Sequence, residues 1–491
     1  MTLNQIKKIF LSVAISALFW GNTFAQDSQT LYYMNRVPQS TMMNPAMQPA
    51  CNFYLGLPVV SSLQLGVGNN RLGLTDVIMK HPTEDSLITF LHPDAEFNTT
   101  DFLNKLGENN FFYEDFRTDL LSFGFRLNTW YFSFNLSERL STSINYPKDL
   151  MSLILEGNSQ FTNTNADLTY LGVNSSFYRE YGLGIAKEIN QTLSVGIRAK
   201  ILFGHANITS DYKENSFTMY TSRDSIYLDA DATVNTSSPL IATTNTDGDF
   251  SGFELPAYIE NSQTDSLIDL ALAHTNMGLG IDLGVYYKPI DKLSLSLSII
   301  DLGYIKWKKE DVTNIDLKGS YSFTGIDVSN DIGGIDSLDS GFDSMLDSLT
   351  NSFTISNTSE SYTTGLGAKV YVGGSYALSK KFDLGFLSRT YFFNSNINQA
   401  FTFSANVRPI NGLSASLSYS IMNGTYNNIG FGLVLGGAPL QLYIISDNAS
   451  AALWGHKTSS FNLRFGLNVA FGCRQKTKAN KIDRPMLKSV F

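Results

Sequence analysis

The segment "FNLRFGLNVAF" (461–471), near the end of the chain, alternates without a break between large apolar residues and residues that are polar or small. Successive side chains of a β-strand point to opposite faces, so this segment predicts a strand with one apolar and one polar face. The same alternation occurs in 122–128, 293–298 and 413–420. Many such strands form either a soluble sandwich or a barrel, and alternation alone does not decide between them.

The lengths of the connections favour a barrel in an outer membrane. Very short links, such as Asn190-Gln191 and "GGAP" (436–439), alternate with long ones, such as 209–275 and 310–361. Short turns at one end and long loops at the other are typical of outer-membrane barrels. A low content of charged residues (16%) and a high content of aromatic residues (13%) agree with strands that face lipid on one side. The net charge of −9 argues against nucleic acid as a partner.

We therefore expect an all-β chain that forms one closed antiparallel transmembrane β-barrel of about 14 strands, with an N-terminal plug segment and long extracellular loops. An even strand number lets the first and last strands pair and leaves both chain ends at the short-turn, periplasmic end. The strand-like segments 214–235 and 315–325 are expected to be hairpins in the long loops. The spanning strands are expected near 53–68, 119–128, 129–140, 178–189, 192–206, 276–288, 292–308, 362–378, 381–393, 396–408, 412–422, 427–436, 439–447 and 459–472.

The beginning of the chain predicts export. Lys7 and Lys8 precede an apolar run, 9–20, that is too short to cross a bilayer as a helix, and a small-residue cleavage signal follows before Gln26. The mature chain is therefore expected in the cell outer membrane, in contact with its lipids. We expect four parts, namely a signal peptide (1–25), a periplasmic or plug segment (26–50), the barrel (51–472) and a basic periplasmic tail (473–491).

The parity of the strands predicts that more cations than carboxylates face the lumen. One interpretation is an anion-attracting lumen or a seat for a carboxylate head group. The other, which the cost of unpaired charge in a narrow barrel favours, is pairing with a plug or with acidic outer loops. The carboxylates expected to face inward are Asp282 and Asp383. The cations expected to face inward are Arg126, Arg139, Arg198, Lys200, Lys369, Arg389, Arg408 and Arg464. Aromatic residues near strand ends are expected outside, at the lipid interface: Trp130, Tyr287, Tyr304 and Trp307.

The segment ahead of the first strand carries Asn44, Pro45 and Ala46, and this "NPA" resembles the segment that precedes the barrel in FadL-like outer-membrane proteins, including the PorV type of Bacteroidota. Together with 179–204, 277–303 and 439–448, it makes the chain most similar to the Bacteroidota domain-of-unknown-function family 5723. The resemblance implies an outer-membrane barrel with an N-terminal segment tucked into it. It implies no established activity, and no functional residue is transferred on its strength.

Sequence patterns of enzymes and metal centres are missing. The five histidines are scattered without ligand spacing, and no nucleophile elbow occurs. We expect no enzyme, no cofactor and no metal. Two functions stay open: uptake or passage of a small amphipathic molecule, and a non-transporting accessory barrel that serves as a scaffold or partner in a secretion or surface complex. The histidines are His81, His92, His205, His274 and His456.

Two acidic stretches lie in the longest loops. Asp247 and Asp249 flank a glycine and predict an ordinary turn rather than a calcium loop, because the later ligands are missing. Residues 331–349 predict a short amphipathic helix over the barrel mouth. Its acidic face is either a solvated face or a cap on the basic lumen.

The chain has two cysteines, and both fall where the barrel closes. The first strand starts just after Cys51, and the last ends just before Cys473. In a closed antiparallel barrel these strands are neighbours, so their periplasmic ends meet. A disulfide needs Cα atoms within about 7 Å, and the periplasm permits it. Because no hairpin fixes the register of this pair, two free thiols near the barrel rim remain the alternative.

Overall fold

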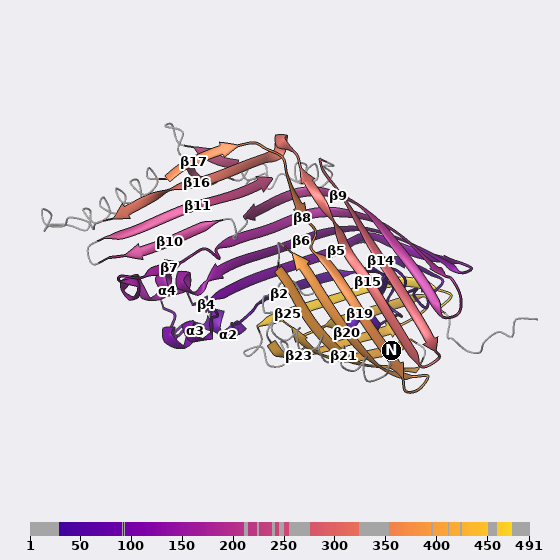
Figure 1. The fold of residues 1–491 in the computed structure, drawn as a ribbon. Helices are drawn as coiled ribbons and strands as arrows, with labels where there is room; N and C mark the ends of the chain where they lie inside the picture. The colour runs from indigo at the N-terminus through magenta and orange to yellow at the C-terminus, as the bar shows by residue number, and fades with distance from the viewer. Residues whose placement is uncertain are drawn as a thin grey trace, which may run out of the picture.

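The computed structural model describes residues 29–90, 92, 94–210, 215–222, 225–237, 241–244, 250–254, 275–323, 353–393, 396–410, 412–422, 425–449 and 459–473. One antiparallel sheet of 21 strands dominates the fold and curls into a barrel (Figure 1). Within the described ranges, no helix has the length and apolar character needed to cross a membrane.

The barrel wall in the described residues consists of fourteen strands, as predicted. Two of them are interrupted: β1 (Phe53–Gly56) and β2 (Leu63–Asn69) share the first position, and β18 (Tyr362–Gly365) and β19 (Ala368–Ala377) share the eighth. The pairing of β25 with β1 and β2 places Phe53 opposite Phe471 and closes the barrel. The remaining strands are β5 (Asn109–Leu127), β6 (Trp130–Pro147), β8 (Gly172–Glu188), β9 (Leu193–Ser210), β14 (Asn276–Ile290), β15 (Leu293–Trp307), β20 (Phe382–Phe393), β21 (Asn396–Ile410), β22 (Leu413–Met422), β23 (Thr425–Gly436), β24 (Leu440–Ser446) and β25 (Ser460–Phe471).

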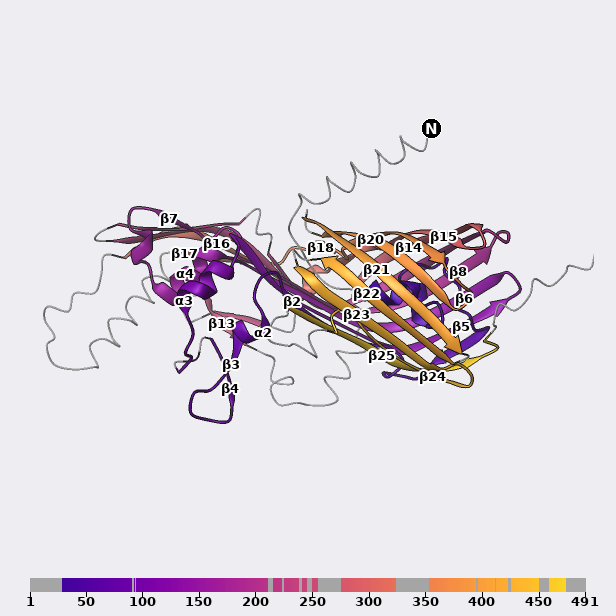
Figure 2. The ribbon, with the colours of Figure 1, turned by 90° about the horizontal axis from the view of Figure 1, so that it is seen from below.

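At the long-loop end the sheet continues into a wing, which projects from the barrel (Figure 2). Residues 207–210 of β9 pair with residues 234–237 of β11, and β16 then pairs along the whole of β11. The segments expected as loop hairpins therefore extend the barrel sheet. The wing comprises β7 (Asn165–Asp167), β10 (Ser216–Thr221), β11 (Ile226–Ser237), β16 (Val312–Phe323) and β17 (Phe353–Thr358).

The two loops that follow the expected strands 53–68 and 129–140 are shorter than those strand ends imply. β5 already begins at Asn109 and β6 runs to Pro147, because alternation continues past the length that a bilayer requires. Buried Phe102 and Met151 pack α3 against α4 beside these long strands. The short elements are α2 (Leu74–Val77), β3 (Ile78–Lys80), β4 (Leu87–Thr89), α3 (Thr99–Lys105), α4 (Lys148–Glu156), η4 (Ser159–Phe161), β12 (Ile241–Thr244), β13 (Phe250–Glu254) and η5 (Lys309–Asp311).

The outward face of the wall is apolar, but the sequence-based prediction that Trp307 lies on it is wrong. Trp130, Tyr287 and Tyr304 are exposed on the outside, as predicted, but Trp307 is completely buried and its Nε1 donates to Thr364 Oγ1 (2.9 Å). The reason is a bulge in β15. Two consecutive residues, Ile300 and Asp301, are both buried, and the register with β14 shifts there. The extra residue inverts the parity of the strand beyond it.

Residues 29–50 lie inside the barrel and are called the plug here. They form two short 3₁₀ helices, η2 (Gln29–Tyr33) and η3 (Pro38–Met42). The plug contributes Leu31, Val37 and Met43 to an apolar cluster with inward wall residues such as Tyr371 and Val434. Burial raises the pKa of the Tyr32 phenol, which stays a neutral donor to Ser296 Oγ (3.1 Å).

The direction of the plug corrects one expectation. Gln29 N donates to Asp447 Oδ2 (2.6 Å), just beyond the long-loop end of β24, whereas Gln48 Nε2 reaches Thr129 O in a short turn (3.4 Å). The chain therefore enters the described structure at the long-loop end and follows the lumen to the short-turn end. The sequence predicts the N-terminal end on the periplasmic side, but a short, nearly uncharged, proline-rich segment carries no signal for its direction.

Candidate functional site

An ionic network crosses the middle of the lumen, and Asp301 is its centre. Arg139 Nη1 and Nη2 contact Asp301 Oδ1 and Oδ2 at 3.0 and 3.2 Å, which is a two-pronged contact. Lys200 Nζ lies 2.5 Å from Oδ1, and Lys369 Nζ lies 3.2 Å from Oδ2. Since Arg139 belongs to β6 and Asp301 to β15, with β8, β9 and β14 between them, this contact joins separated parts of the wall.

Other buried carboxylates complete the network. Glu180 lies 3.0 Å from Arg139 and 3.6 Å from Arg117, and Asp282 lies 2.7 Å from Lys200. Buried charges of this kind are stable only when they are paired and hydrogen-bonded. The Asp301 network, as defined by its ion pairs, comprises Arg117, Asp119, Arg139, Glu180, Arg198, Lys200, Asp282, Asp301 and Lys369.

The predicted inward cations that lie outside the network contact other groups of the lumen. Arg408 pairs with Asp383, and Arg464 Nη2 donates to Ser62 Oγ (2.8 Å). Arg126, at the short-turn end, donates to Pro49 O (2.9 Å) and pairs with Glu188. Arg389 is completely buried. Arg198, within the network, also reaches Thr41 Oγ1 of the plug at 3.3 Å.

The predicted excess of eight cations over two carboxylates is wrong. Among the described residues, eight cations are buried: Arg117, Arg139, Arg179, Arg198, Lys200, Lys369, Arg389 and Arg464. Seven carboxylates are buried: Asp119, Glu138, Glu180, Asp282, Asp301, Asp383 and Asp447. The sequence held a signal for Glu180, which shares its parity with the small inward residues Gly182 and Gly184. For Asp301, which a bulge turns inward, the signal was the break in alternation at Ile299 and Ile300.

An outer cavity lies on the long-loop side of the network. Its volume is about 720 Å³, which includes space open to solvent. Tyr113, Tyr178, Tyr391, Ile305 and Leu366 supply aromatic and aliphatic lining. Arg139 and Lys369 supply positive charge, and Asp115 supplies one carboxylate. The Arg139 guanidinium lies 5.6 Å from the centre of the Tyr178 ring, and Lys369 Nζ lies 5.6 Å from that of Tyr391. The cavity is therefore amphipathic, and its two cations belong to the Asp301 network.

An inner cavity of about 350 Å³, again counting open space, lies on the other side of the same cations. Asp301, Lys200 and Arg139 line it from the network, and Met42 and Met43 line it from the plug. Arg139 is common to both cavities. The contact between Arg139 and Asp301 thus stands between the outer cavity and a space that the plug bounds.

The "NPA" residues fix the plug to the wall. Asn44 is completely buried, and its Nδ2 donates to two wall carbonyls, Val285 O and Leu297 O (3.4 Å each). Within the plug, its Oδ1 accepts from Ala46 N (2.9 Å). Glycines make room for this turn. A Cβ on Gly284 would lie 2.2 Å from Asn44 Oδ1, and one on Gly196 would lie 2.4 Å from Pro45 C. Here the glycines permit a close backbone approach.

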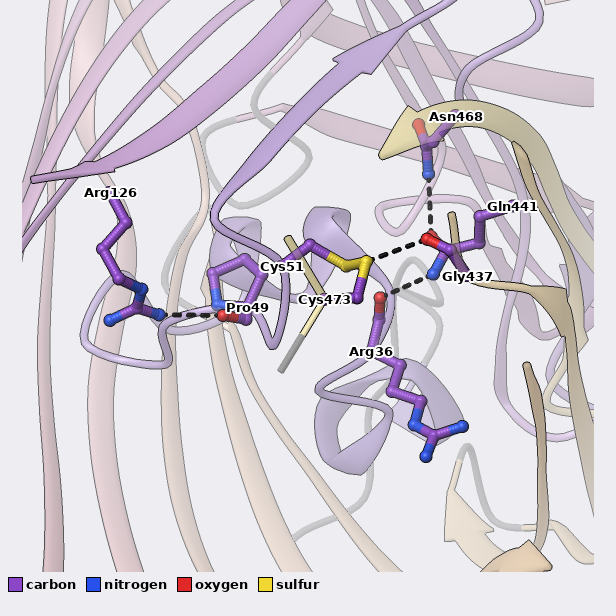
Figure 3. Close-up of a disulfide and its surroundings, with 8 residues drawn as sticks. All are labelled: Arg36, Pro49, Cys51, Arg126, Gly437, Gln441, Asn468 and Cys473. Atoms are coloured by element: carbon purple, nitrogen blue, oxygen red, sulfur yellow. Dashed lines mark hydrogen bonds between the residues drawn. A yellow bond between two sulfur atoms is a disulfide. The ribbon is translucent and has the colours of Figure 1, made fainter. Parts of the chain in front are cut away.

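The structure brings Cys51 and Cys473 together at the closing pair of strands. Their Sγ atoms are 2.05 Å apart and their Cα atoms 3.7 Å apart (Figure 3). The contact of Arg126 with Pro49 and the bond from Gln441 Nε2 to Arg36 O (2.9 Å) hold the plug nearby. The disulfide thus joins the exit of the plug to the end of the last strand.

Two of the histidines that look scattered in sequence lie close together in an outer loop. His81 Nε2 is 3.4 Å and His92 Nδ1 is 3.8 Å from Asp94 Oδ2. The His81 Nδ1 atom, however, accepts backbone N–H groups of Thr83 and Glu84, which places the ring proton on Nε2. A metal needs a lone pair on that nitrogen, so this trio fits an Asp–His contact better than a metal site.

Several predicted features lie outside the described residues. These are the calcium or turn segment around Asp247 and Asp249, the helix at 331–349, the signal peptide, the tail beyond Cys473, His274 and His456. His205 is described; it is buried in the lumen against Phe177, with its Nε2 atom 3.5 Å from Glu138 Oε2.

The sequence matches one protein family and no curated protein sequence. Residues 45–447 match the family described as "Family of unknown function (DUF5723)". In structure, a Pseudomonas aeruginosa FadL homologue is similar with a TM-score of 0.39 at 10% identity, covering 92% of this chain and all of the other (100%). The Ralstonia pickettii toluene transporter TbuX is similar with a TM-score of 0.37 at 11% identity, covering 88% and 93%.

The Pseudomonas putida toluene transporter TodX is similar to the same extent, with a TM-score of 0.33 at 10% identity, covering 91% of this chain and 93% of the other. These likenesses concern the fold, and the toluene transport named for two of the proteins belongs to them. The strand order and pairing of this chain define its architecture as a closed antiparallel β-barrel.

Proposed function

Because the chain belongs to the DUF5723 family, whose function is unknown, its role has to be argued from the site, and we propose that it binds a small amphipathic molecule with an anionic group. The observation that carries this proposal is the outer cavity. Its lining combines tyrosine rings and aliphatic side chains with two cations, Arg139 and Lys369, and with one carboxylate, Asp115, which accepts from Gln64 Nε2 (2.9 Å). Ligand sites commonly combine apolar walls with a few placed polar groups that fix orientation.

The arrangement of the lumen supports passage as well as binding. The ligand enters from the long-loop end and places its anionic group at the cations, with its apolar part against the tyrosines. The inner cavity lies beyond the network, and the plug closes the lumen after it. Passage therefore requires two movements, one in the network and one in the plug. In this proposal a signal peptide, 1–25, exports the chain to the outer membrane, where membrane lipids surround its apolar face.

A binding measurement with three amphiphiles of the same length tests the proposal. The full mature chain in nanodiscs is titrated with decanoate, 1-decanol and decyltrimethylammonium, and empty nanodiscs supply the background. Decanoate is expected to bind more tightly than the other two, with one molecule per barrel. Equal binding of all three, or none above background, would contradict the proposal.

A second candidate function is an accessory barrel that carries a partner protein. The observation in its favour is the wing, in which β7 and β17 are the edge strands of the sheet and lie away from the barrel. Extraction from native membranes in mild detergent, followed by mass spectrometry of the bound lipids and proteins, distinguishes the two candidate functions. A bound amphiphile at one per barrel supports the first function, whereas a partner chain in fixed stoichiometry, without ligand, supports the second.

A further inference from the structure

We infer, on the basis of the proposed function, that Asp301 competes with the ligand for two cations. It holds Arg139 and Lys369 until the anionic group of the ligand displaces it. The geometry of the cations carries this inference. Asp301 takes both outer nitrogens of the Arg139 guanidinium and one contact of Lys369 Nζ. The same two cations line the outer cavity, whereas Asp301 lines only the inner one. A carboxylate that enters from outside thus meets two cations that an internal carboxylate already holds.

The charge of the network makes displacement feasible. Five cations face four carboxylates in the ion pairs of the network, an excess of one positive charge. Within the network, an incoming anion neutralises that excess. Asp115, the carboxylate that lines the outer cavity, lies outside these ion pairs and accepts from Gln64 Nε2 (2.9 Å). Arg139 keeps its contact with Glu180 at 3.0 Å, and Lys200 keeps its contact with Asp282 at 2.7 Å. The cations therefore remain paired while Asp301 moves.

The backbone at Asp301 is suited to movement. Asp301 has φ 59°, a left-handed conformation that costs an L residue energy. The wall is irregular on both sides of it: the register with β14 shifts, and β18 gives way to β19. Leu366 N bonds to Gly303 O (3.1 Å), which holds the wall together across the break. Three cations hold the Asp301 side chain in the lumen, and releasing it frees a strained residue.

Displacement also joins the two cavities. Arg139 lines both, and its contact with Asp301 separates them. When the head group takes Arg139, the link from β6 to β15 is broken and the outer cavity opens toward Met42 and Met43 of the plug. Ligand binding and the first step of passage are then the same event.

Asp301→Asn is the variant that tests the inference. Asparagine keeps the size of the side chain and tolerates a left-handed backbone, but it carries no charge to compete for the cations. Its affinity for decanoate is expected to rise at least about tenfold, the equivalent of one charged hydrogen bond no longer in competition. The affinity for 1-decanol is expected to stay unchanged. The matched control is Asp383→Asn, which removes a lumen carboxylate that pairs with Arg408 and lines neither cavity.

The outcomes separate this inference from the proposed function. If neither the wild type nor Asp301→Asn binds decanoate above background, the proposed function fails. If the wild type binds decanoate and Asp301→Asn binds it no more tightly, or if Asp383→Asn has the same effect, the competitor inference alone fails.

A second variant keeps the inference testable should Asp301→Asn not fold. Lys369→Gln removes one of the two cations at issue. Its decanoate affinity is expected to fall about tenfold with no change for 1-decanol. Unchanged decanoate affinity would overturn the inference, since Lys369 would then not hold the head group.

Discussion

The seating of the plug depends on two glycines of the wall, and Gly284→Ala tests this with one methyl group. The new Cβ would lie 2.2 Å from Asn44 Oδ1 and 2.9 Å from both Ala46 N and Pro45 Cδ. Contacts below 3.0 Å require a shift, and all three atoms belong to the "NPA" turn. We therefore expect the turn to leave the wall while the barrel strands stay paired.

The magnitude follows from the bonds that the turn loses. Asn44 Nδ2 gives up its bonds to two carbonyl oxygens of the wall, Val285 O and Leu297 O. At about 1 kcal/mol each, the loss is about 2 kcal/mol, which raises the population of the unseated turn about 30-fold. Hydrogen exchange measured by mass spectrometry is the assay. The peptide 40–48 is expected to exchange about 30-fold faster, and peptides from β14 and β15 are expected to be unchanged.

Gly365→Ala is the matched control, because a Cβ at Gly365 meets nothing within 4 Å. It is expected to leave the exchange of 40–48 as in the wild type. If Gly284→Ala also leaves that exchange unchanged, the plug does not sit against the wall as described. If the two variants speed exchange equally, the effect is not one of packing at the turn.

Three further predictions follow from the contacts of the plug and the wall. Asp447→Asn should speed the exchange of 29–34 but not of 40–48, because Asp447 accepts bonds from Gln29 N and Thr30 N only at the long-loop end; equal effects on both peptides would contradict this. Unheated protein should change its gel mobility on reduction, and full alkylation of both thiols without reductant would rule the bridge out. The double variant Cys51→Ser, Cys473→Ser should lower the unfolding free energy by a few kcal/mol, because the bridge spans 422 residues. Trp307→Phe should destabilise the barrel by about 1 kcal/mol through the lost bond to Thr364, whereas Trp130→Phe, on the exposed face, should not, as denaturant titration will show.

Strand number and barrel closure were predictable because they depend on local signals. Alternation marks each strand, and short turns fix which strands pair, so the wall follows from pairs of neighbouring segments. The meeting of Cys51 and Cys473 follows in turn from closure. The wing could not be predicted in this way, since a hairpin in a loop and a continuation of the sheet show the same alternation of apolar and polar residues. Only the pairing of β11 with β9 distinguishes them.

The site was less predictable, because it depends on irregularities and on contacts between distant strands. The predicted cations are buried or contact groups of the plug and lumen, whereas the carboxylate at the centre of the network, Asp301, was missed. Asp301 faces inward only because two residues of β15 stand opposite one of β14, and the mark of this bulge is the break in alternation at Ile299 and Ile300. The same bulge misplaced Trp307. The direction of the plug, likewise, is set by Asp447, which lies 418 residues from Gln29.

The most direct test of the account is an experimental structure with 10-bromodecanoate, in which anomalous scattering locates the bromine. The account predicts one bromine peak in the outer cavity among Tyr113, Tyr178 and Tyr391, with the carboxylate at hydrogen-bond distance from Arg139. It also predicts that Asp301 has left Arg139. Bromine found only on the outer face of the barrel, or in the cavity with the Arg139–Asp301 contact intact, would contradict it.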